Sequence, residues 1–195
     1  MESFKIEYKK PKVEYIRNSI FYFSSCQSKE EMSLLSKQIL SPEDDIKPFY
    51  LFARDVHNMM PDYDVETLKK EYSLIIALMQ MHNTWKTIIG DEDKERYYLQ
   101  YRFALDAYTP KKIIPLKDVT LPVDDPYWAY FFPPNGYNFR DLALLVRKDK
   151  YPLSNSEEVF RIASKAIKRP FRFNCGNDNF PIDDFIKYHP QAEES

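Results

Sequence analysis

The spacing of apolar side chains predicts helices across the first half of the chain. Ser28 and Glu31 have the spacing of a capping box, and apolar residues then recur at helical intervals, so we expect a helix over residues 29–40. Pro48 is well placed as the first residue of a second helix, which a later proline ends. Asp64 can cap a third helix of about 25 residues with one apolar face.

Alternation of apolar and polar residues predicts short strands elsewhere. Residues 1–27 alternate in "FKIEY" and again in "SIFYFSS", which fits short extended segments. Residues 99–103 alternate strictly and predict a strand with one buried face. The apolar run "LALLV", residues 142–146, suits a short buried strand.

The C-terminal part of the chain adds one more helix. Ser154 and Glu157 repeat the capping-box spacing and predict a helix that ends near Ile167. "FRFN", residues 171–174, fits a final short strand, and residues 186–195 read as a flexible tail. No repeat or flexible linker divides the chain, so we expect a single domain. The predicted class is α+β, with a helical N-terminal half, then a small mixed half with short strands and a long Pro/aromatic-rich loop.

That loop runs over about residues 106–139 and contains the segment "DDPYWAYFFPPNGYNF". Its prolines favour extended and turn conformations, and Gly136 permits a positive φ. The rings either anchor the loop to the domain, which is favoured for most of them, or form a docking surface, for which Tyr130 and Phe132 are the expected contacts. The candidate interaction or structural residues are Asp125, Pro126, Tyr127, Trp128, Tyr130, Phe132, Pro133, Pro134, Asn135, Gly136 and Arg140.

Charge and cysteine usage narrow the class of partner. The chain has 28 basic and 30 acidic residues, and this balance gives no electrostatic reason to expect nucleic acid or an acidic membrane surface. No apolar run approaches the length of a membrane span. Cys26 and Cys175 are far apart and read as free thiols in a reducing compartment, which favours a cytoplasmic protein.

The familiar catalytic and metal-binding motifs are absent from the sequence. Three glycines are too few for a glycine-rich phosphate loop, and the three histidines form no ligand cluster. His82 lies on the apolar face of the third predicted helix and reads as a hydrogen-bonded histidine at the core edge rather than a base. Cys175 reads as an ordinary thiol, and Asp124 and Asp125 as turn-forming residues rather than an acid/base pair. We therefore expect no catalytic residues, no metal and no cofactor.

Several segments of the chain carry a family resemblance. "TLPVDDPYWAYFFPPNGYNFR" followed by "LVRKDKYPLSNSEE" resembles the C-terminal part of the phage Mu F-like head morphogenesis proteins, in the form found in Bacteroidetes prophages. "YFSSCQSKEEMSLLS", "IKPFYLFARDV", "LKKEYSLIIALMQMHNTW" and "LQYRFALD" are similar to helices and the first strand of that family, and "FRFNCGND" to its closing motif. The resemblance covers about residues 15–185.

The resemblance implies a minor head protein that acts through protein contacts near the portal during head assembly and genome packaging. Its implied partners are phage portal or capsid proteins, and its implied location is the bacterial cytoplasm or the virion. It implies no established catalytic residues. A diverged or domesticated prophage remnant fits as well, because several residues depart from the family pattern.

The departures fall where the family has candidate soft metal ligands. The family usually follows its Pro-Pro-Asn-Gly turn with Trp-Asn-Cys-Arg-Cys and has a histidine upstream, which resembles a metal-binding or thiol-stapled knuckle. Phe139 and Asp141 stand at the two cysteine positions here, and Ile113 stands at the histidine position. We therefore expect aromatic packing, rather than a metal ion, to hold this loop.

Two other functions stay open at this point. An enzyme of unknown type would use the loop as a pocket wall and would show convergent polar groups with a shifted pKa. A nucleic-acid-binding module would use basic residues interleaved with aromatic ones, although solvated surfaces explain most such clusters. The basic candidates are Arg147, Lys148, Lys150, Lys168, Arg169 and Arg172.

Overall fold

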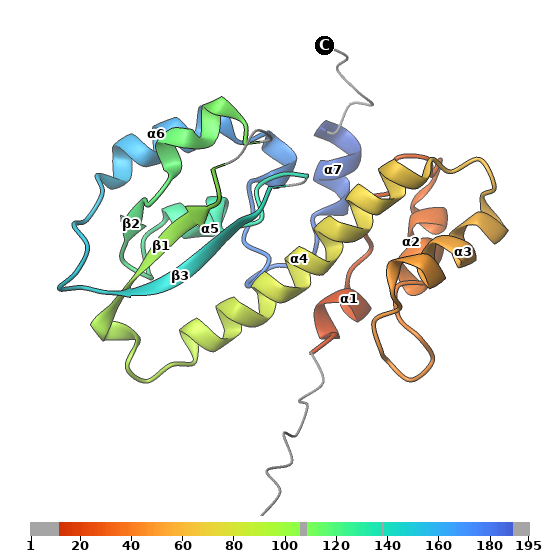
Figure 1. Cartoon of the computed structure of the whole chain (residues 1–195), viewed down its shortest axis with the longest axis horizontal. Helices are drawn as coiled ribbons and strands as arrows, with labels where there is room; N and C mark the ends of the chain where they lie inside the picture. The colour runs from red at the N-terminus through yellow and green to blue at the C-terminus, as the bar shows by residue number, and fades with distance from the viewer. Residues whose placement is uncertain (1–11, 106–108, 138, 189–195) are drawn as a thin grey trace, which may run out of the picture.

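The computed structural model describes residues 12–105, 109–137 and 139–188 and has an α+β fold (Figure 1). The first half is helical, with α1 (Glu14–Asn18), α2 (Lys29–Lys37), α3 (Phe49–Met59) and α4 (Val65–Ile89). The sheet consists of β1 (Tyr97–Phe103), β2 (Thr120–Leu121) and β3 (Asp141–Arg147). The remaining elements are η1 (Lys94–Arg96), η2 (Lys111–Leu116), α5 (Tyr127–Phe131), α6 (Ser156–Ala166), η3 (Arg169–Phe171) and α7 (Ile182–Tyr188).

Side-chain caps begin α2 and α4 as the sequence predicts. Ser28 Oγ accepts a hydrogen bond from the Glu31 N–H at 3.2 Å. Asp64 Oδ2 accepts one from the Thr67 N–H at 2.7 Å at the start of α4. Each bond satisfies a backbone donor that the first helical turn leaves unpaired, so the sequence sets both starting points.

α4 is the central element of the fold and separates the helical half from the sheet (Figure 1). It buries residues on more than one side, because it contacts α1 and α3 as well as β3. Buried Glu71 accepts hydrogen bonds from the Ser24 N–H at 2.9 Å and the Tyr63 hydroxyl at 2.6 Å. The Glu71 side chain therefore joins the irregular segments around Ser24 and Tyr63 to α4.

The sheet is antiparallel with the strand order β2-β1-β3. Leu99 of β1 lies between Leu121 and Leu145, and Phe103 pairs with Asp141 at the start of β3. Within the described residues β3 is an edge strand. The prediction of a buried strand over residues 142–146 is wrong for one face, since Leu142 and Leu144, which alternate with buried Ala143, are 37% and 42% exposed.

Other sequence predictions fail where tertiary contacts decide the local structure. The predicted loop over residues 106–139 contains η2, β2 and α5. Asn155, rather than Ser154, caps α6, because Ser154 Oγ accepts from the Thr120 N–H at 3.0 Å. No strand forms at residues 171–174, which begin at the end of η3.

The ends of the chain also differ from expectation. Residues 14–18, predicted to be extended, form α1, which is too short to show a helical period. The segment "SIFYFSS" forms no strand, and "FKIEY" lies outside the described residues. Residues 186–188 belong to α7 instead of a tail, because Phe185 is buried against Phe180 and Phe171.

Candidate functional site

Most rings of the aromatic loop, defined as residues 124–140, face the interior. Tyr127, Trp128, Phe131 and Phe132 are at most 1% exposed. The Trp128 indole N–H donates to the Pro122 carbonyl at 2.9 Å, which satisfies its one polar group. Anchoring is therefore the use that the structure shows for these rings.

The loop is joined to α4 and to the C-terminal segment. The Phe132 ring meets the Trp85 ring of α4 edge-on at a centroid distance of 4.8 Å. Asn174 Nδ2 donates to the Trp128 carbonyl at 3.0 Å. The expectation that Phe132 is an exposed contact is wrong, whereas Tyr130 is 51% exposed.

The Pro-Pro-Asn-Gly turn, residues 133–136, is buried. Pro133 and Pro134 are buried and joined by a cis peptide bond. Gly136 permits a positive φ but does not adopt one. A Cβ on Gly136 would lie 2.9 Å from the Phe139 ring, so the glycine leaves room for that half-buried ring.

Asp125 organises the start of α5. Its Oδ1 accepts hydrogen bonds from the Tyr127 N–H at 2.8 Å and from the Ser156 hydroxyl at 2.9 Å. The carboxylate thus joins the aromatic loop to the first residue of α6. This contact agrees with the turn-forming role predicted for Asp125, and Pro126 follows it on the surface.

A buried polar centre lies where the loop enters β3, and no sequence motif predicts it. Asp141 Oδ2 accepts hydrogen bonds from the Tyr101 hydroxyl at 2.5 Å and from the Asn135 N–H at 3.0 Å. The Asn135 side-chain amide donates to the same oxygen at 3.2 Å and to the Phe131 carbonyl at 3.1 Å. These bonds fix the turn against β1.

Burial raises the pKa of Asp141, although the hydrogen bonds from Tyr101 and Asn135 act in the opposite direction. Among the residues that the structure describes, no hydrogen-bond partner reaches buried Asp141 Oδ1, Asn135 Oδ1 or the Tyr127 hydroxyl. The second carboxyl oxygen therefore lacks the donors that would stabilise a full negative charge. Desolvation favours the protonated acid here.

A groove lies beside this centre, between α4 and the first half of β3. Its volume is about 1050 Å³. The helical wall includes Ser73, Ala77, Gln80 and Thr84, and the opposite wall is formed by residues 141–144 with part of the aromatic loop, including Gly136, Tyr137, Phe139 and Arg140. We call this feature the α4–β3 groove.

The α4–β3 groove brings together only some of the residues predicted from the sequence. Pro134, Gly136 and Arg140 line it, whereas the rings of Trp128 and Phe132 pack in the core. Leu142 and Leu144, which were not among the candidate residues, supply exposed apolar surface. Sequence reasoning missed them because a short apolar run reads as fully buried.

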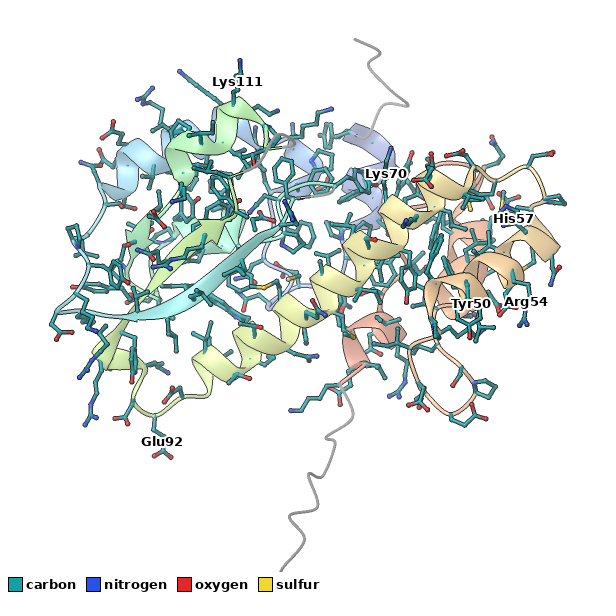
Figure 2. The ribbon with its side chains drawn as sticks, in the orientation of Figure 1. Tyr50, Arg54, His57, Lys70, Glu92 and Lys111 are labelled. Carbon is teal, nitrogen blue, oxygen red and sulfur yellow. The ribbon has the colours of Figure 1, made fainter. Side chains whose placement is uncertain are left out.

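The thiols and histidines of the described residues form no metal-binding cluster. Burial raises the pKa of the Cys26 thiol to about 12 and that of Cys175 further, so both stay protonated at neutral pH. His82 Nδ1 lies 2.6 Å from the Cys175 carbonyl, which agrees with the core-edge prediction. His57 lies on α3 (Figure 2), whereas His82 lies on α4. Ile113 is buried in η2.

The basic candidates do not converge on one surface element. Arg147 and Lys148 lie at the end of β3, where Lys148 approaches the Tyr98 ring at 5.1 Å. Arg169 stacks on Tyr188 at 3.9 Å. The Arg172 guanidinium donates to backbone carbonyls at the end of α6 and so has a structural role. The basic candidates thus lie on more than one element of the fold.

No family model matches the chain. Searches of curated proteins and of solved structures likewise return no match. The resemblance to Mu F-like proteins therefore depends on the order and content of the sequence motifs. Among the described residues, no helix is both long and apolar enough to cross a membrane.

Proposed function

We propose that this chain is a non-enzymatic, protein-binding component of phage head assembly that contacts a portal or capsid protein. The observation that carries the protein-binding part is the α4–β3 groove, which is bordered by an edge strand with exposed Leu142 and Leu144. Exposed apolar surface beside polar residues is typical of protein interfaces. The phage setting comes from the motif resemblance.

The chemistry of the groove favours binding over catalysis. Its walls present mainly apolar side chains, hydroxyls and an amide, and the charged residues that line it are Arg140 and Asp141. Asp141 is buried and already accepts hydrogen bonds from Tyr101 and Asn135, which is typical of a structural acid. The two thiols of the described residues are held protonated by burial. A catalytic use would require an exposed, activated nucleophile or base.

The binding test uses purified portal and major capsid proteins of a Bacteroidetes prophage that encodes a Mu F-like head protein, immobilised for biolayer interferometry. A double variant, Leu142→Asp with Leu144→Asp, places two charges on the exposed edge of the groove. We expect it to weaken binding at least about tenfold, because desolvating a charge in an apolar contact costs more than about 1.4 kcal/mol.

Leu153→Asp is the matched control, since Leu153 is 52% exposed and lies outside the α4–β3 groove. We expect the control to bind as the native chain does, and far-UV circular dichroism checks that all variants remain folded. The proposal is wrong if neither the portal nor the capsid protein binds the native chain. It is also wrong in its choice of surface if the double variant binds normally.

A further inference from the structure

We propose that the α4–β3 groove binds an extended segment of a partner protein, which adds a fourth strand to the sheet beside β3. The partner segment has apolar side chains in its centre and carboxylates at its ends. This inference rests on the proposed protein-binding function and specifies the kind of segment that the groove takes. Three features of the groove carry it.

The first feature is that the groove follows the edge of β3. Four consecutive residues, 141–144, line it. Successive side chains of a strand point to opposite faces of a sheet, so a groove over one face would meet only alternate residues. Contact with all four therefore places the groove along the strand edge, where backbone N–H and C=O groups on the side away from β1 are directed.

The second feature is the helical wall. Ser73, Ala77, Gln80 and Thr84 recur at intervals of four, three and four residues, so they form one stripe along α4. Their side chains are short or flexible and uncharged. Neighbouring strands in a sheet lie about 4.8 Å apart, and a wall of short or uncharged side chains is one against which a further backbone can pack. Leu74 and Met81 supply an apolar floor.

The third feature is the charge at the two ends of β3. Arg140 precedes the strand, and Arg147 ends it next to Lys148. An antiparallel pair of β3 strands from two copies would place Arg140 of one copy near Arg147 or Lys148 of the other, and like charges across a pair are destabilising. A segment with carboxylates at both ends is complementary instead. Arg147 also forms an ion pair with Asp149, in which Nε and Oδ1 are 3.8 Å apart and both side chains are exposed.

The probe is a fluorescein-labelled peptide, Glu-Val-Thr-Val-Thr-Val-Glu, measured by fluorescence anisotropy with the native chain. Two further peptides carry N-methyl groups, one on the valine nitrogens and one on the threonine nitrogens. In an added strand, the backbone N–H groups of only one of these two alternating sets of residues point toward β3. We expect one methylated peptide to lose at least about tenfold in affinity and the other to bind nearly as the parent does.

Two protein variants locate the contact. Ala77→Trp fills the groove from α4 and should weaken the parent peptide at least about tenfold. Ala129→Trp, on the exposed side of α5, is the control and should leave affinity unchanged. Arg147→Glu should weaken the glutamate-ended peptide about threefold and strengthen a lysine-ended version by a similar factor.

Several results would overturn the proposal. Equal affinity of both methylated peptides would exclude backbone pairing with β3. A dimer seen by light scattering and abolished by Ala77→Trp would assign the groove to a second copy. A full-length Ile6→Asp chain that binds the peptide at least about tenfold more tightly would assign it to this chain's own N-terminal segment. Peptide binding without portal or capsid binding would leave strand addition intact and refute only the phage role.

Discussion

Removing the Trp128 side chain tests whether the aromatic loop is an anchor. Trp128 is 1% exposed, its indole N–H donates to the Pro122 carbonyl at 2.9 Å, and its ring meets the Tyr127 ring edge-on at 4.9 Å. Truncating a buried Trp to Ala typically costs about 3–5 kcal/mol. An unsatisfied carbonyl adds to the cost, so we expect Trp128→Ala to lower the free energy of unfolding by about 4 kcal/mol.

Two companion variants separate the contributions. Trp128→Phe keeps most of the buried ring but loses the hydrogen bond, and should cost about 1–2 kcal/mol. Tyr130→Ala removes a ring that is 51% exposed and should cost less than about 1 kcal/mol. The comparison therefore distinguishes a buried anchor from a surface ring in the same short helix.

Urea titration followed by far-UV circular dichroism gives the free energies by linear extrapolation. Circular dichroism is preferred because Trp fluorescence would change with the substitution itself. If Trp128→Ala loses no more stability than Tyr130→Ala, the ring does not anchor the loop. The burial and hydrogen bonding described above would then be wrong for this segment.

Three further outcomes follow from the structure. Burial raises the pKa of Asp141, so the stability that this group contributes is present in full below the unfolded pKa of about 3.9 and is lost as pH rises through the folded pKa. The free energy of unfolding of Asp141→Asn should therefore rise relative to that of the native chain between about pH 4 and pH 7. A difference between the two that stays constant with pH in urea melts would contradict this. Gly176→Ala would place a Cβ 2.1 Å from the Trp85 ring and should cost at least about 2 kcal/mol by the same melts, unless the ring can shift. Elemental analysis should find less than about 0.1 zinc per chain after dialysis, because Phe139, Asp141 and Ile113 replace the soft ligands of the resembled family, and one retained zinc would disprove that reading.

The sequence by itself determines the elements whose information is local. The caps at Ser28 and Asp64 need only residues three positions away, and both form as predicted. The long helical period of α4 and the alternation of residues 99–103 also lie within one element. These signals were sufficient to predict the α+β class and the anchoring of most loop rings.

Only the tertiary structure decides which side of β3 is covered and which polar groups are buried together. Asp141 meets Tyr101 across 40 residues of sequence, and Ser154 is drawn from its expected cap to the backbone of Thr120. Leu142 and Leu144 read as core residues, but they stay exposed because they point to the face of β3 opposite to buried Asp141 and Ala143. Strand order and burial depend on contacts between distant segments, which no local pattern encodes.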